Sequence, residues 1–198
     1  MQPAIDVHWL REDIVTAPGP AAAPALLVRD FVNTLNAQSA DDQLHSPAAL
    51  AQWLREHGLA TGRSATDADL RAAVALREGL RAELREHHDR AGSTPGRRDI
   101  SRRRLDRILA GYPLRLGIRT GAPQVEPVGT GTSAGLAGIV AAVAESHADL
   151  SWPRLKVCQE PSCQWAFLDT SRNQSRCWCS MRLCGNRAKI KAYRARQD

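Results

Sequence analysis

Apolar side chains recur every three to four residues along much of the first 150 residues, which is the spacing of amphipathic helices. Ser46 followed by Pro47 marks one helix start, and Thr66 or Ser64 caps the next, because these residues satisfy or tolerate the free amides of a first helical turn. The pattern predicts helices over 21–36, 46–58, 66–92, 97–109 and 132–147.

One short segment of this region has a different period. Between Pro113 and Arg119 apolar residues alternate with arginine or glycine, which is typical of a strand, and 124–128 supplies a return strand. We therefore expect a mainly α body with one small β hairpin.

Composition places the chain among ordinary folded proteins. It has 198 residues with 43% hydrophobic and 24% charged residues, enough for one domain with a small appendage. No stretch reaches the roughly 18–20 apolar residues of a membrane span, and the first residues lack a signal-peptide pattern, so we expect a cytoplasmic protein without membrane contact. The six histidines show no metal-ligand spacing and no nucleophile motif is present, which argues against an enzyme.

Positive charge is concentrated at the C-terminal end. Residues 154–198 hold ten Lys or Arg against three Asp or Glu, whereas residues 1–153 hold 17 against 18. A near-neutral body with a basic tail suggests a polyanionic partner, with nucleic acid ahead of an anionic membrane surface.

All five cysteines lie in the same basic segment. Cys158 and Cys163 are separated by four residues, Cys179 and Cys184 are separated by four, and fifteen residues lie between the pairs. Two such pairs predict a four-cysteine zinc site, which also stabilises a module too small to fold by burial alone. A ligand register that uses Cys177 is the alternative.

The residues between and after the pairs suggest a treble-clef-like module. Residues 164–168 are strand-prone, 169–173 are turn-rich and 175–179 can form the returning strand. From Ser180 onward the chain predicts a helix, on which one stripe of alanines (Ala188, Ala192, Ala195) is small enough to lie against the hairpin.

The other stripes of the final helix are cationic, as expected of a helix that contacts DNA. Together with polar residues of the preceding loop, the candidate DNA contacts are Arg172, Asn173, Arg176, Asn186, Arg187, Lys189, Lys191, Tyr193, Arg194 and Arg196.

Several short motifs make the segment from Leu155 resemble the bacterial CGNR zinc-finger family. They are Cys184-Gly185-Asn186-Arg187, Trp178-Cys179-Ser180-Met181 and Asp169-Thr170-Ser171-Arg172-Asn173. Residues 30–34 and 46–54 similarly resemble the helical ABATE domain that precedes this finger.

The resemblance implies a stress-induced transcription regulator whose finger binds DNA. It also implies that Cys158, Cys163, Cys179 and Cys184 hold Zn²⁺. The family usually has another residue at Cys177, so this thiol is either a bystander or an oxidisable sensor.

We therefore expect a helical domain over 1–150 and a zinc finger over 154–198. The finger contacts double-stranded DNA, and the body either dimerises or senses a small-molecule effector. A pocket for that effector is predicted at Trp9, Phe31, Asn33 and Trp53. The alternative function is a zinc-stabilised module that docks a protein or an RNA.

Overall fold

The structure is a computed structural model that describes residues 23–59, 64–88, 95–119 and 121–197. Its helices are α1 (Ala23–Val32), α2 (Pro47–Glu56), α3 (Asp67–Arg85), α4 (Pro95–Leu109), α5 (Gly131–Ala148) and α6 (Asn186–Arg194). Its strands are β1 (Leu35–Asn36), β2 (Asp41–Asp42), β3 (Leu114–Arg119), β4 (Ala122–Pro127), β5 (Leu155–Val157) and β6 (Ala166–Leu168). No helix among the described residues combines the length and apolar character needed to span a bilayer.

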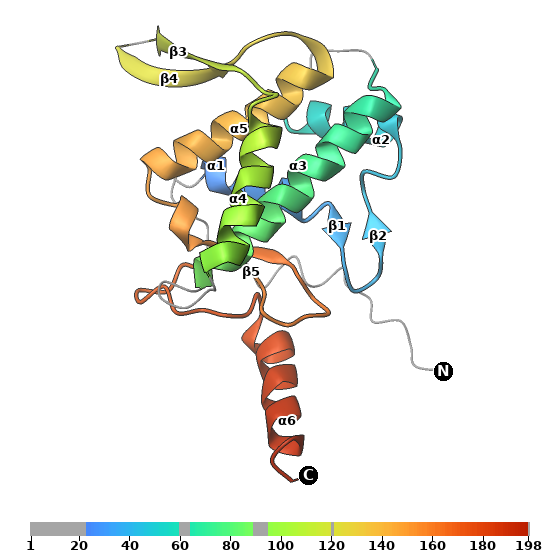
Figure 1. Ribbon diagram of the computed structural model, residues 1–198, viewed down its shortest axis with the longest axis vertical. Coiled ribbons are helices and arrows are strands. Elements are labelled where there is room, and N and C mark those ends of the chain that lie inside the picture. The colour runs from blue at the N-terminus through green and yellow to red at the C-terminus, as the bar shows by residue number, and fades with distance from the viewer. Residues whose placement is uncertain (1–22, 60–63, 89–94, 120, 198) are drawn as a thin grey trace.

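The strands form three separate antiparallel pairs, β1–β2, β3–β4 and β5–β6, around a helical body. Helix α3 contacts α1, α2, α4 and α5, and its apolar side chains lie in the centre of the core. The β3–β4 hairpin lies at one end of the molecule and α6 extends from the opposite end (Figure 1). The predicted mainly α architecture is confirmed.

The predicted helix starts at Ser46 and Thr66 are confirmed by their capping contacts. The Ser46 hydroxyl accepts a hydrogen bond from the amide of Ala49 at 3.1 Å, and Pro47 occupies the first turn of α2. Thr66 and Asp69 form a reciprocal capping box at the start of α3. These local signals act within one helical turn, so the sequence alone reveals them.

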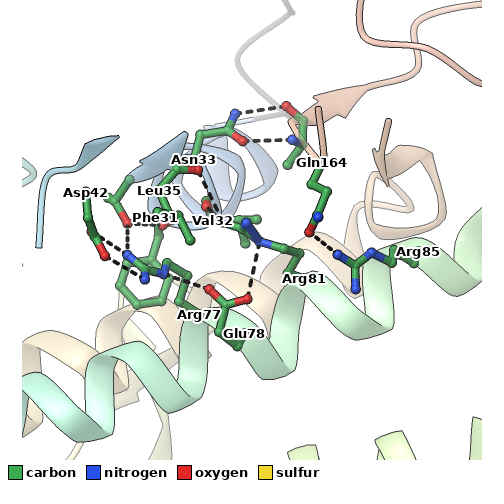
Figure 2. A network of polar contacts seen from close by, with 12 residues as sticks. Phe31, Val32, Asn33, Leu35, Asp42, Arg77, Glu78, Arg81, Arg85 and Gln164 are labelled. Carbon is green, nitrogen blue, oxygen red and sulfur yellow. Dashed lines mark hydrogen bonds and ion pairs between the residues drawn. The ribbon is translucent and has the colours of Figure 1, made fainter. Parts of the chain in front are cut away.

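Helix α1 ends at Val32, earlier than the predicted Asn36, because α3 supplies a buried cation at this point. Arg81, only 1% exposed, donates a hydrogen bond to the carbonyl of Val32 (Figure 2), which satisfies one of the carbonyls left free at a helix end. Leu35 then pairs with Asp42 in β1–β2 instead of continuing the helix.

A second arginine of α3 fixes the β1–β2 pair. Arg77 donates two hydrogen bonds to the Asp42 carboxylate, at 2.7 and 2.9 Å, and a third to the hydroxyl of Thr34 (Figure 2). Burial alone would raise the pKa of Asp42, but the hydrogen bonds from Arg77 and the amide of Leu44 outweigh it, so this pKa is lowered. The paired charges hold the segment after α1 against α3.

The predicted hairpin between 113 and 128 is confirmed as β3–β4, with Leu116 opposite Val125. Arg115 and Glu126 form an ion pair across the strands at 2.6 Å. Leu116 and Ile118 are 71% and 78% exposed, so this alternating apolar face is left largely uncovered at the hairpin end.

The strand pair of the C-terminal module differs from the prediction. β6 pairs with β5, which precedes the first cysteine, and the predicted partner segment 175–179 forms no strand. The physical reason is where each segment is buried: Leu155 and Val157 are 0% and 1% exposed and belong to the core of the body, whereas Trp178 and Cys179 pack in the separate cluster around the cysteines. The core therefore continues across the predicted boundary at 150–154.

Candidate metal centre and nucleic-acid interface

The first cysteine pair is positioned by strands β5 and β6. Cys158 directly follows β5, and its amide donates to the carbonyl of Trp165 at 2.8 Å, which extends the strand pairing by one step. A tight turn then brings Cys163 back, with its amide donating to the carbonyl of Glu160 at 2.9 Å. Both thiols are buried.

The second pair lies at the start of the C-terminal helix. A π-helical turn over Met181–Gly185 leads into α6, and the Ser180 carbonyl accepts hydrogen bonds from the amides of Cys184 and Gly185. The Ser180 hydroxyl caps the same turn through the amide of Leu183. Cys184 is thus built into the first turn, so a metal at this thiol fixes where α6 begins.

The four predicted ligands, Cys158, Cys163, Cys179 and Cys184, come together with all Sγ atoms within 4.8 Å of one another. The Sγ of Cys179 lies 3.6 Å from that of Cys163 and 3.8 Å from that of Cys184. A tetrahedron with Zn–S bonds of about 2.3 Å has S···S edges of about 3.8 Å, so the spacing fits zinc.

The close approach of these thiols also affects their ionisation. Hydrogen bonds from the other three thiols lower the pKa of Cys158, whereas the neighbouring thiols raise the pKa of Cys179. Four sulfurs this close cannot all ionise without a compensating charge, which a divalent metal ion supplies.

Cys177 lies outside this group. Its half-buried Sγ is 3.4 Å from the carbonyl of Ser175, and its own carbonyl accepts from the amide of Gln159. Cys177 therefore contributes to the module through its backbone, and the structure brings Cys179 rather than Cys177 to the other three thiols.

A buried ion pair organises the loop between the two cysteine pairs. Asp169 is 0% exposed, and one of its oxygens accepts from the Lys156 ammonium at 2.9 Å and from the amide of Arg176 at 3.0 Å. Its other oxygen accepts from the amide and hydroxyl of Ser171. Burial alone would raise the pKa of Asp169, but these hydrogen bonds lower it. The loop therefore presents exposed Arg172 at a fixed position.

Helix α6 does not pack on the strand pair as predicted. Ala188 is half-buried, but Ala192 and Ala195 are exposed, as are all described side chains from Lys189 to Gln197. The helix points away from the body (Figure 1). The predicted packing of the alanine stripe against the hairpin is therefore wrong for Ala192 and Ala195, because α6 buries none of its own residues.

The ten candidate DNA contacts differ in how exposed their side chains are and in whether they already bond to other groups of the protein. Arg176 is half-buried: its guanidinium donates to the carbonyls of Trp178 and Cys179 and lies 5.1 Å from the ring centroid of Phe167. It therefore holds the second cysteine pair in place and is not a free donor on the surface.

Arg187 is exposed, but its guanidinium is hydrogen-bonded to other segments at the N-terminal end of α6. It donates to the Ser162 hydroxyl at 3.3 Å, and the side-chain amide of Gln38, turned to satisfy both groups, accepts from it at 2.7 Å. The remaining candidates are exposed and lie on the loop tip, on α6 or in the turn that follows it: Arg172, Asn173, Asn186, Lys189, Lys191, Tyr193, Arg194 and Arg196.

The described members of the predicted effector pocket are buried inside the protein. Phe31 and Trp53 are 0% and 5% exposed core residues with ring centroids 5.5 Å apart. Asn33 exchanges two hydrogen bonds with the backbone of Ala166 (Figure 2). Trp9 lies outside the described residues. Phe31 and Trp53 therefore pack in the core and Asn33 binds the backbone of β6, while the effector pocket itself stays a prediction.

Several residues that connect body and finger were missed by the sequence analysis. The His87 ring bonds to the carbonyl of Leu155 and the His88 ring to that of Val157. The 3-10 turn that follows α3 (Glu86–His88) is therefore hydrogen-bonded to β5 immediately before the first ligand. Two adjacent histidines carry no sequence signal for this role, because their acceptors lie almost 70 residues away.

Two family models match the chain. A model described as "Putative stress-induced transcription regulator" (ABATE) matches residues 26–151, and one described as "CGNR zinc finger" matches residues 154–197. No curated protein matches the chain. The finger match and the four clustered thiols together identify a zinc site.

Proposed function

Because the chain belongs to the ABATE family and carries a CGNR zinc finger, we propose that it is a transcription regulator whose finger binds double-stranded DNA. The observation that carries this proposal is α6, an exposed cationic helix that begins at the metal site and extends away from the body (Figure 1). Lys189, Lys191 and Arg194 are exposed on it, and Arg196 is exposed in the turn that follows.

The zinc in this proposal is structural. Four cysteine thiolates complete a tetrahedral shell, which leaves no position for a water or a substrate, so we do not assign an enzymatic activity. The ion holds the two cysteine turns together and thereby fixes the start and direction of α6.

The experiment is DNA binding by the full chain across a salt series. Each phosphate contact should contribute about −0.9 to the slope of log affinity against log salt, so a contact by four to seven cations gives about −4 to −7. Substituting alanine for both Lys191 and Arg194 should reduce this slope by about 2. A salt-insensitive interaction, or none with any promoter fragment, would contradict the proposal.

For the body we propose dimerisation through the β3–β4 hairpin. Leu116 and Ile118 are 71% and 78% exposed on the same face, and among the described residues each strand of the hairpin pairs only with the other, so that a strand edge can meet that of a second copy. Sedimentation should show a dimer that Leu116→Asp converts to a monomer, while Gln124→Asp, at an exposed position on the other face, should retain it. A monomeric wild type at micromolar concentration would leave effector sensing as the role of the body.

The alternative is a zinc-stabilised module that docks a protein or an RNA. A bound protein that persists after nuclease treatment, combined with failure to bind duplex DNA, would favour this alternative.

A further inference from the structure

Resting on the proposed DNA binding, we infer that one face of α6 reads base edges in the major groove. This reading face consists of Asn186, Ile190, Tyr193 and Gln197. The inference names which side chains determine sequence specificity and separates them from the cations that contact phosphates.

The spacing of these four residues places them on a single side of the helix. At about 100° per residue, positions i, i+4, i+7 and i+11 fall within an arc of about 60°. Gln197 lies in the turn that follows α6, where its backbone amide donates to the carbonyl of Arg194. Its side-chain amide donates to the Tyr193 hydroxyl at 2.7 Å, which brings the two side chains together.

The cations lie on both sides of the reading face. Lys191 and Arg194 project to one flank, Lys189 and Arg196 to the other, and the alanine stripe faces the opposite way. A helix about 10–12 Å across fits a major groove about 12 Å wide, so a helix inserted with its reading face inward directs each flank toward one phosphate wall.

The chemistry of the reading face suits base edges better than water. Ile190 and Tyr193 are 53% and 59% exposed on a helix that buries none of its own residues, so folding does not explain these apolar groups. An isoleucine side chain can contact the methyl group of thymine, and the amides of Asn186 and Gln197 can bond adenine in bidentate fashion. The face therefore favours A·T base pairs.

The position of the face along the groove is set by the metal site. Asn186 is exposed and comes two residues after Cys184, whose thiol is held in the metal cluster. Arg187 is joined to Ser162 at the same point, so the root of α6 has a fixed orientation relative to the first cysteine turn. We expect Asn186 to read the base pair closest to the body.

The test begins by selecting the preferred duplex from a random pool with the full, zinc-loaded chain. Affinity for this duplex and for a scrambled one is then measured for the wild type and for single alanine variants at several salt concentrations. Zinc content is measured for every variant, and retention of one zinc per chain shows that the finger is intact.

Ile190→Ala and Asn186→Ala should lower the affinity for the selected duplex by about 4-fold or more, leave the affinity for the scrambled duplex unchanged and keep the salt slope. Lys191→Ala is the matched control from the flank: it should weaken binding to both duplexes equally and reduce the slope by about 0.9. Equal losses on both duplexes for the Ile190 and Asn186 variants would overturn the inference.

A second measurement pairs the Ile190 side chain with its target. Replacing individual thymines of the selected duplex by deoxyuridine removes one methyl group, which should cost the wild type about fourfold at one or two positions. The same replacement should cost Ile190→Ala nothing. If no position responds, or if the two losses simply add, the reading face is wrong; if the wild type binds no duplex at all, the proposed function itself fails.

Discussion

Asn33 is the residue whose removal most directly tests how the body supports the finger. It follows α1, yet its amide group donates to the carbonyl of Ala166 at 2.9 Å and accepts from the amide of the same residue at 2.7 Å. It therefore bonds to the edge of β6 as a neighbouring strand would (Figure 2). Asn33→Leu keeps a similar side-chain size and removes both hydrogen bonds.

The expected cost follows from burial. Asn33 is 7% and Ala166 0% exposed, so the backbone amide and carbonyl of Ala166 would lose their partners away from water. An unsatisfied buried polar group costs about 1–3 kcal/mol, which gives about 2–6 kcal/mol for the two groups. That is a large part of the 5–15 kcal/mol typical of a folded domain.

The assay is urea unfolding followed by tryptophan fluorescence with zinc in excess, compared through the free energy of unfolding extrapolated to water. Asn173→Leu is the matched control, because Asn173 is exposed and a surface substitution should stay within about 0.5 kcal/mol. A loss of less than about 0.5 kcal/mol for Asn33→Leu would refute the argument that this amide joins body and finger.

Three further predictions concern the ion pair, the metal and acid. Lys156→Met should lower the free energy of unfolding by about 3–5 kcal/mol, because it leaves the Asp169 carboxylate buried without its cation; a loss below 1 kcal/mol by urea unfolding would contradict this. Cys184→Ser should release zinc and Cys177→Ser should retain it by elemental analysis, whereas zinc loss from the second variant would shift the ligand register. Burial lowers the pKa of His87, so the folded state resists its protonation, and stability should decline as pH falls below the ordinary value of 6.5. His87→Gln should show a shallower decline, and an identical decline would assign the acid sensitivity to other groups.

The local features of the sequence predicted the helices of the body well. Ser46 and Thr66 act on amides within their own first turns, and the alternation around Leu116 reports a strand whose partner is only a few residues away. Contacts of this range are encoded by neighbouring residues, so pattern and capping reveal them. The end of α1 was missed because Arg81, which caps it, comes from another helix.

The sequence by itself also determined the metal chemistry and the sign of the charge around it. Two cysteine pairs and a basic segment are compositional facts that hold in any fold, and the described thiols meet within 4.8 Å as the spacing requires. Only the tertiary structure decided that β5 rather than 175–179 pairs with β6, and that the Asn33 side chain bonds to the backbone of β6. It also decided that α6 is exposed and does not pack on the body. Each of these three features depends on contacts between residues far apart in the sequence. Burial is a property of the whole packed chain, so a short stretch of sequence does not reveal it.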